Sequence, residues 1–182
     1  MIMPPGLRKF ALALHLTLSV GWIGAVVAYL ALGVAARTSQ DPLTVRGAWI
    51  AMERTGWFAI VPLAVASLLT GFVMALGTKW GLFQHYWVLI SLALTVFATT
   101  ILLLHMPTVS YLADVAREAD AARLDELGGD LLHPGIGLVV LLVIQVLNVY
   151  KPRGMTRYGQ RKQRRQRQAQ QRERTRRPAP AG

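Results

Sequence analysis

The chain of 182 residues contains no cysteine, and only nine of its residues are Asp or Glu. The absence of cysteine excludes disulfides, thiolate nucleophiles and cysteine-bound iron–sulfur clusters. The long apolar stretches contain no acidic residue, which argues against a carboxylate proton relay inside a membrane. No Ser/His/acid set and no phosphate-binding loop is visible in the sequence, so it favours a protein without catalytic activity.

What the chain does have is four long blocks without a formal charge, each at least 20 residues long. A helix needs about 20 apolar residues to cross the ~30 Å hydrocarbon core of a bilayer. Because lipid offers no partners to exposed backbone groups, a helix is the form expected of each block. We therefore predict an all-α, four-transmembrane-helix bundle with spans at about 10–36, 56–78, 86–106 and 133–150.

The positive charges predict the orientation of these spans. With the N-terminus inside, the inner segments hold 15 of the 20 Lys and Arg residues, and the outer loops hold five. Basic residues near span ends favour the cytoplasm, so we expect a multi-pass plasma-membrane protein with both termini cytoplasmic. A cleaved signal peptide is the alternative for the first block, but its apolar region would be only about 7–15 residues long.

Residues 1–150 form the predicted transmembrane domain, and two further segments accompany its spans. After Pro107, apolar residues recur near helical spacing and charged residues fill the other side, which predicts an amphipathic helix on the outer surface. Residues 151–182 are rich in Arg and Gln and contain one acidic residue, Glu173. This basic cytoplasmic tail has no apolar face, and we expect it to be disordered.

Ionisable residues inside a membrane are candidate functional groups, and histidine is the type present here. His15 lies about one and a half turns inside the first span, where cofactor-binding and purely structural roles are both open. His15 and His85 fall toward the inner side, and His105 and His133 toward the outer side, which suggests two haem groups held by histidine pairs. That arrangement is disfavoured because His85 and His105 lie about 200° apart around an ideal helix.

A single outer site is the preferred candidate, formed by His105, Met106 and His133 at the outer ends of consecutive spans. A heptad stripe of small, hydroxyl-bearing and apolar residues leads along the third span to His105 and directs it toward the core. Imidazole and thioether groups suit copper, and imidazole alone suits one haem b. The alternative is that both histidines are interfacial and bond to water or to loop carbonyls.

The basic tail predicts binding to anionic lipid headgroups, with Arg161, Lys162, Arg164 and Arg165 as the candidate residues. Each basic residue near a membrane surface adds about 1 kcal/mol of attraction to anionic lipid. Anchoring of the topology is a second interpretation of the same charges. Nucleic acid is a disfavoured partner, because no folded nucleic-acid module and no interleaved aromatic residues accompany them.

Two stretches resemble known membrane protein families. Leu14–Leu16 together with Gly21–Gly24 resembles the first span of CopD-like copper-resistance membrane proteins. The run from Leu68 to Pro107, most specifically GTKWGLFQHYWV, is similar to a family of predicted bacterial integral membrane proteins of unknown function, common in actinobacteria. The resemblance covers most of residues 10–150 and implies a helical fold in a membrane, without an assigned activity.

Together these patterns predict a polytopic membrane protein that carries a histidine-based metal or haem site. Two alternatives stay open at this point. One is a copper-handling or b-haem electron-transfer protein, in which the site is the function. The other is an accessory subunit or transporter component that binds lipid, a membrane protein partner or further copies of itself.

Overall fold

The computed structural model describes residues 3–77, 83–120, 123–124, 127, 129–152 and 154–176, with the side chains of 173–176 excepted. Nearly all of this part of the chain is helical, with one isolated β-bridge. The helices are α1 (Pro5–Thr38), α2 (Pro42–Thr55), η1 (Gly56–Ile60), α3 (Val61–Gly77), α4 (Tyr86–Glu118), α6 (Leu132–Tyr150) and α7 (Arg157–Arg176).

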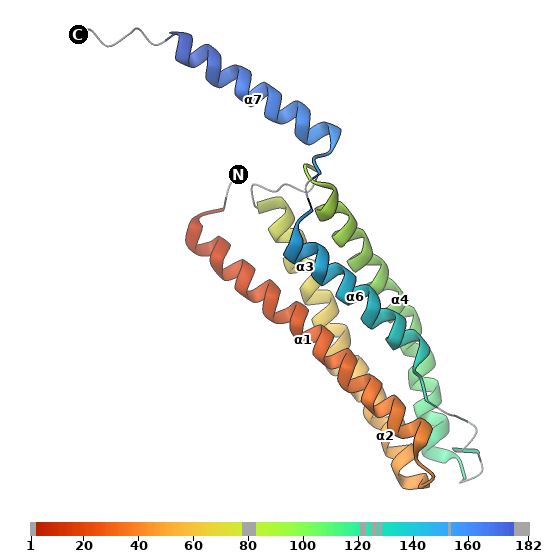
Figure 1. The fold of residues 1–182 in the computed structure, drawn as a ribbon. Helices are drawn as coiled ribbons and strands as arrows, with labels where there is room; N and C mark the ends of the chain where they lie inside the picture. The colour runs from red at the N-terminus through yellow and green to blue at the C-terminus, as the bar shows by residue number, and fades with distance from the viewer. Residues whose placement is uncertain are drawn as a thin grey trace.

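Among the described residues, four helical units are long and apolar enough to cross a membrane, namely α1, the continuous unit from α2 to α3, α4 and α6. The predicted all-α fold with four membrane-spanning helices is confirmed. The helices α1, α3, α4 and α6 run side by side, and α2 lies at the end away from the N-terminus (Figure 1). We name the end with Pro5 and Tyr150 the terminal end, and the end with Thr38 and Leu132 the distal end.

Pro107 lies inside α4, where the sequence predicted the end of the third span and a separate outer helix. The structure instead continues one helix of 33 residues through the proline to Glu118. Proline removes one backbone hydrogen bond, but the flanking helix is held by burial of Met106, Val109 and Ala113 where α4 packs on α2. The first part of the predicted amphipathic outer helix, as far as Glu118, is therefore the last part of α4.

The second span begins as α2, widens into the π-helical turn η1 and continues as α3. Pro62 follows this turn at the start of α3, and its missing N–H and its ring disrupt the regular backbone ladder there. Asp41 caps α2 by accepting hydrogen bonds from the backbone N–H groups of Leu43 and Thr44. Hydrogen bonds from the Thr44 hydroxyl and from these two N–H groups lower the pKa of Asp41 below its usual value.

The largest fully buried side chains gather toward the distal end, where α1, α2 and α4 meet. Trp49, Met52 and Met106 are each no more than 1% exposed. Gly56 permits this packing, because a Cβ at that position would lie 2.5 Å from the Met106 methyl group. The apolar core of the bundle therefore sits in its distal half.

Two arginines also fasten α2 to α4 at the distal end. Arg46 donates through Nε to the carbonyl oxygen of Ala116 at 3.0 Å and through Nη2 to that of Ala119 at 2.7 Å. These carbonyls belong to the C-terminus of α4, where the helix leaves its last acceptors unpaired. Arg117 of α4 pairs with Glu53 of α2. Charge and apolar burial together close this end of the bundle.

At the terminal end, the segment after α6 pairs with the segment before α4. Met155 forms the antiparallel bridge with His85, and the N–H of Thr156 donates to the carbonyl of Gln84 at 3.0 Å. The buried Thr156 hydroxyl also donates to the carbonyl oxygen of Phe83. Packing against the bundle therefore continues past α6 as far as Gly159, which is buried against the Gln84 backbone.

The helix α7 corrects the prediction that the basic tail is disordered. It spans 20 residues and leaves the bundle at the terminal end (Figure 1). Arg, Gln and Lys have high helix propensity, and the prediction from composition left this out. Residues 160–172 are all exposed, as expected of a segment without an apolar face, and residues 177–182 lie outside the described part.

Candidate functional site

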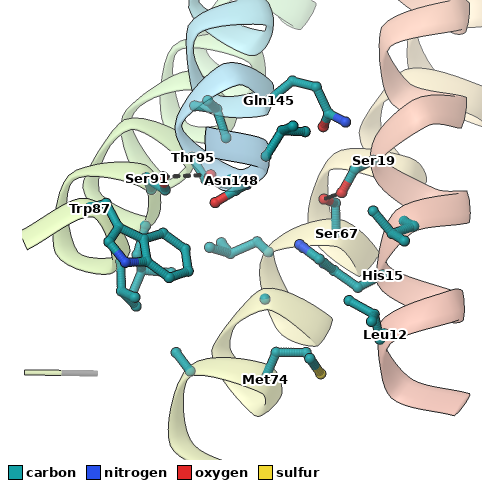
Figure 2. Close-up of a pocket in the computed structure, with 18 of the residues that line it drawn as sticks. Leu12, His15, Ser19, Ser67, Met74, Trp87, Ser91, Thr95, Gln145 and Asn148 are labelled. Carbon is teal, nitrogen blue, oxygen red and sulfur yellow. Dashed lines mark hydrogen bonds between the residues drawn. The ribbon is translucent and has the colours of Figure 1, made fainter. Parts of the chain in front are cut away.

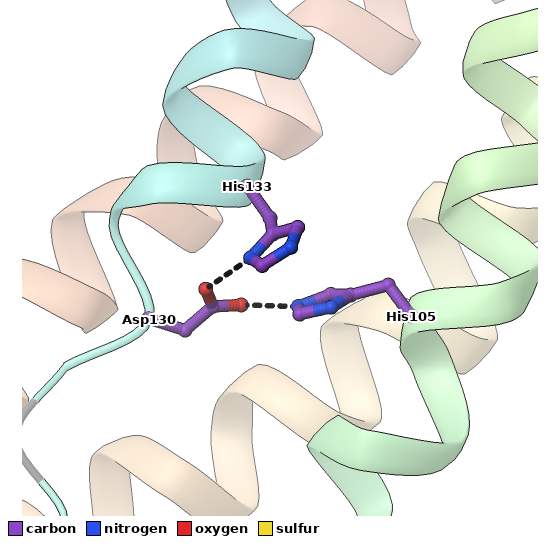
Figure 3. A group of neighbouring side chains, drawn as sticks. All are labelled: His105, Asp130 and His133. Carbon is purple, nitrogen blue, oxygen red and sulfur yellow. Dashed lines mark hydrogen bonds and ion pairs between the residues drawn. The ribbon is translucent and has the colours of Figure 1, made fainter.

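Three side chains meet at the distal end, where α6 begins beside α4 (Figure 3). His105 comes from α4, His133 from the first turn of α6, and Asp130 from the connection just before α6. One nitrogen of each histidine and one carboxylate oxygen lie within 4.8 Å of one another. The two imidazole rings stack with their centroids 4.3 Å apart, so the structure brings together the histidines that the sequence paired.

Asp130 is the centre of this cluster, which we call the distal cluster. His105 Nε2 lies 2.6 Å from Asp130 Oδ2, and the Tyr29 hydroxyl donates to the same oxygen at 3.0 Å. Since an ionised carboxylate only accepts hydrogen bonds, His105 donates through Nε2–H. His133 Nδ1 lies 3.8 Å from Asp130 Oδ1. The carboxylate therefore has contacts to α1, α4 and α6.

The electrostatics of Asp130 follow from these contacts. Its side chain is only 10% exposed, and this burial on its own would raise the pKa of the carboxyl group. The hydrogen bonds with His105 and Tyr29, and the nearby His133, outweigh the burial and hold the pKa of Asp130 below its usual value. The group is therefore a carboxylate at neutral pH.

Two glycines allow the connection before α6 to reach α1. A Cβ on Gly33 would lie 2.8 Å from the carbonyl oxygen of Asp130. A Cβ on Gly129 would lie 2.2 Å from the carbonyl oxygen of Gly33. No side chain fits in either gap, so close backbone approach requires glycine on both sides. This contact carries Asp130 to Tyr29 on α1 and to His105 on α4.

Met106, which the sequence placed in the outer site, is part of the apolar core instead. It is 1% exposed, and its sulfur lies 2.7 Å from the position of a Cβ on Gly56. Neighbouring positions on a helix differ by about 100°, so Met106 and His105 occupy different faces of α4. The correction follows from this angle, because adjacent residues cannot both point to one small site.

His15 and His85 lie away from the distal cluster. His15 is on α1, 14 residues before Tyr29, which is about 21 Å along the helix. Its Nδ1 lies 3.0 Å from the Thr70 hydroxyl, which itself donates to the carbonyl of Ala66. His15 is thus the donor to Thr70. His85 is the N-cap residue of α4 at the terminal end. The pairing of His15 with His85 at an inner haem stays a prediction.

Sequence reasoning missed Asp130, Tyr29 and Gly33. One local signal was present, because Asp130 stands three residues before His133 at the edge of an uncharged block. Tyr29 gave no local signal, since it lies 101 residues from Asp130 along the chain. Its role depends on how the first and fourth spans pack.

Comparison of the chain with family models, with curated proteins and with solved structures finds no match. The two resemblances seen in the sequence therefore stay predictions, and the chemistry of the site is argued from its geometry.

We expect Tyr29→Phe to lower the free energy of unfolding by about 1.5–3 kcal/mol, as for other hydrogen bonds to charged groups. The phenyl ring keeps the packing, while the nearly buried Asp130 carboxylate loses one donor. Unfolding by sodium dodecyl sulfate in mixed micelles measures the change. Tyr111→Phe, at a position of α4 that is 67% exposed, is the matched control and should have no effect. Equal stability of the two variants would contradict the role given to the Tyr29 hydroxyl.

Proposed function

We propose that this polytopic membrane protein binds one divalent transition-metal ion, of the zinc(II) or copper(II) class, through His105, Asp130 and His133. The observation that carries the proposal is the convergence of three donor atoms within 4.8 Å. Two imidazoles and one carboxylate are ligands that both ions accept, with water completing the coordination shell. The copper-handling alternative suggested by the first span falls within this proposal.

The donor spacing suits such an ion after a small adjustment. Ligands about 2.0–2.2 Å from a tetrahedral ion lie about 3.4 Å from one another. The distances from Asp130 to His105 and to His133, 2.6 and 3.8 Å, lie on either side of that value. An ion bound to His105 Nε2 would replace the hydrogen bond to Asp130, with the Nε2 proton released or moved to Nδ1. The Tyr29 hydroxyl would continue to orient the carboxylate. The His133 side chain is 57% exposed and has room to turn.

A metal ion fits the cluster better than a haem. Two histidines that ligate one haem approach its iron from opposite faces of the porphyrin. The stacked rings of His105 and His133 are 4.3 Å apart, which leaves no room for a porphyrin between them. The burial of Met106 in the core removes the soft sulfur ligand that would favour copper(I).

The orientation of the protein in the plasma membrane is the next part of the proposal. The distal end and its connections hold Arg37, Arg46, Arg54, Arg117 and Arg123. In the sequence, the other 15 basic residues precede the first apolar block, lie between the second and third blocks or follow the fourth. This bias supports a cytoplasmic terminal end and an extracytoplasmic distal cluster. Metal would then reach the site from outside the cytoplasm.

The helix α7 supports the proposed binding to anionic lipid. Arg161, Lys162, Arg164 and Arg165 are all exposed, so their charges are available to a membrane surface. The helix is tied to the bundle through Thr156, which keeps it next to the headgroups of the same leaflet. Attraction of about 1 kcal/mol for each basic residue would draw α7 onto an anionic bilayer.

For the metal site, we expect the chelator-treated, purified protein to bind one Zn²⁺ or Cu²⁺ ion per chain in calorimetric titration. His105→Ala and His133→Ala should each weaken binding at least about tenfold, since a metal of this class needs its protein ligands. His85→Ala and Met106→Leu are the controls and should keep full affinity. Retention of the ion by both His105→Ala and His133→Ala, or a wild-type protein that binds none, would reject the site.

For the orientation, the absence of natural cysteine permits single-cysteine labelling. We expect a membrane-impermeant maleimide to label Gln40→Cys, in the connection between α1 and α2, in intact cells. Gln163→Cys in α7 is the matched variant and should react only after the membrane is permeabilised. Labelling of Gln163→Cys but not of Gln40→Cys in intact cells would show that the distal end is cytoplasmic and would contradict the proposed orientation.

For the tail, we expect a polarity-sensitive dye on Gln163→Cys to report a less polar surrounding in anionic nanodiscs than in zwitterionic ones. High salt should reverse the difference, because surface charges are screened. Replacing Arg161, Lys162, Arg164 and Arg165 by Gln should abolish it. A signal that is independent of lipid charge would contradict lipid binding by the tail. Its positive charges would then serve only to fix the orientation of the protein in the membrane.

A further inference from the structure

A cavity of about 670 Å³ lies between α1, α3, α4 and α6 in the terminal half of the bundle (Figure 2). Its volume falls within the range of about 300–1,000 Å³ typical of ligand sites. Ser91 on α4 and His105 of the distal cluster are 14 residues apart, which is about 21 Å along the helix. The cavity is therefore separate from the proposed metal site.

The lining of the cavity changes in character with depth. Arg8, Lys9 and Lys151 line it at the terminal end, next to the membrane surface. Trp22 and Leu141 line its deep end, and this part is apolar. Between them lies a polar layer, about 10 to 15 Å along α1 from Lys9. The polar layer consists of His15, Ser19, Ser67, Ser91, Thr95, Gln145 and Asn148.

Part of this polar layer is satisfied within the protein. Ser19 and Ser67 share a hydrogen bond of 2.8 Å between α1 and α3. His15 donates to Thr70, and the Thr95 hydroxyl donates to the backbone carbonyl of Ser91 at 2.8 Å. These hydrogen bonds join residues of the cavity wall to one another. The donors in them already have acceptors within the protein.

One group of the polar layer lacks such a partner. Ser91 is 6% exposed, and within the described part of the chain its hydroxyl oxygen has no hydrogen-bond partner. Gln145 and Asn148 line the same layer, and Figure 2 shows both side chains between the helices. An unpaired polar group in hydrocarbon costs several kcal/mol, so the Ser91 hydroxyl is placed to meet a polar partner inside the cavity.

We propose that the cavity binds a single-chain anionic phospholipid. Its phosphate lies at the cationic end beside Arg8 and Lys9, where charge-assisted hydrogen bonds are strong. Its hydroxyl and ester groups lie deeper in the cavity and meet the polar layer at Ser91, Gln145 and Asn148. Its hydrocarbon chain contacts the apolar wall. The order of charge, hydrogen-bonding groups and apolar surface in the ligand matches the order in the cavity.

The test is native mass spectrometry of the purified full-length protein in a maltoside detergent. We expect 1-oleoyl-lysophosphatidylglycerol to bind at one site per chain, at least about tenfold more tightly than 1-oleoyl-lysophosphatidylcholine. Glycerol 3-phosphate, which has the headgroup chemistry without the chain, should not compete at equal concentration. Competition by glycerol 3-phosphate would overturn the proposal in favour of a soluble phosphate ligand. Equal binding of the two lysolipids would overturn it in favour of nonspecific lipid uptake.

Variants of the polar layer locate the bound lipid. Ser91→Ala removes the unpaired hydroxyl without added volume and should weaken binding about fivefold, the equivalent of one hydrogen bond. Asn148→Leu fills the cavity and should reduce binding at least about tenfold. Thr100→Val, on the exposed side of α4, is the matched control. Unchanged affinity in Ser91→Ala and Asn148→Leu would mean that the lipid binds outside the cavity and would overturn the proposal.

Variants of the cationic end separate the cavity from α7. Arg8→Gln with Lys9→Gln should weaken binding of the anionic lysolipid at least about tenfold. Arg161→Gln with Lys162→Gln removes the same charge from α7 and should leave the single tight site intact. The opposite ranking would place the lipid on the tail and overturn the assignment to the cavity. All variants keep the distal cluster, so zinc binding tests the proposed metal site independently.

Discussion

The nearly buried carboxylate of Asp130 is the constraint on which the distal end of this bundle depends. A buried charge costs several kcal/mol unless donors surround it, and here the donors come from separate spans. Tyr29 on α1 and His105 on α4 bind the carboxylate, and His133 on α6 approaches it. Satisfying one charge therefore fixes the relative position of three helices. Because His105 and His133 both approach Asp130, their imidazole rings also lie together. The contacts that stabilise the buried carboxylate therefore also assemble the proposed metal ligands.

Much of the fold could be predicted because a bilayer imposes simple rules on the sequence. Uncharged length located the four spans, and matching depth paired His105 with His133. Asp130 could not be found in this way, since its position depends on the glycine contact of Gly33 with the connection before α6. Met106 was assigned wrongly because matching depth in the membrane ignores the angle around the helix. The helix α7 was missed because an absent apolar face was taken to mean an absent helix.

The two halves of the bundle are packed differently. Large side chains such as Trp49 and Met52 fill the distal half, with exposures of 1% or less. In the terminal half, small and hydroxyl-bearing residues line a cavity between the helices. Ser67, Gly71 and Ser91 are among the residues that line this cavity. The packed distal end, with its charged cluster, suits a metal ion. The terminal end, with its cavity and basic residues, suits an anionic lipid.

X-ray absorption at the zinc edge of the zinc-loaded, full-length protein tests the central claim most directly. Zinc held by His105, Asp130 and His133 has nitrogen and oxygen ligands at about 2.0–2.2 Å and shows the outer-shell scattering of two imidazoles, reduced to one in His133→Ala. A spectrum of zinc bound only by oxygen, or one unchanged by His133→Ala, would contradict it. The distal cluster would then have only a structural role, in which contacts with Asp130 hold three helices together.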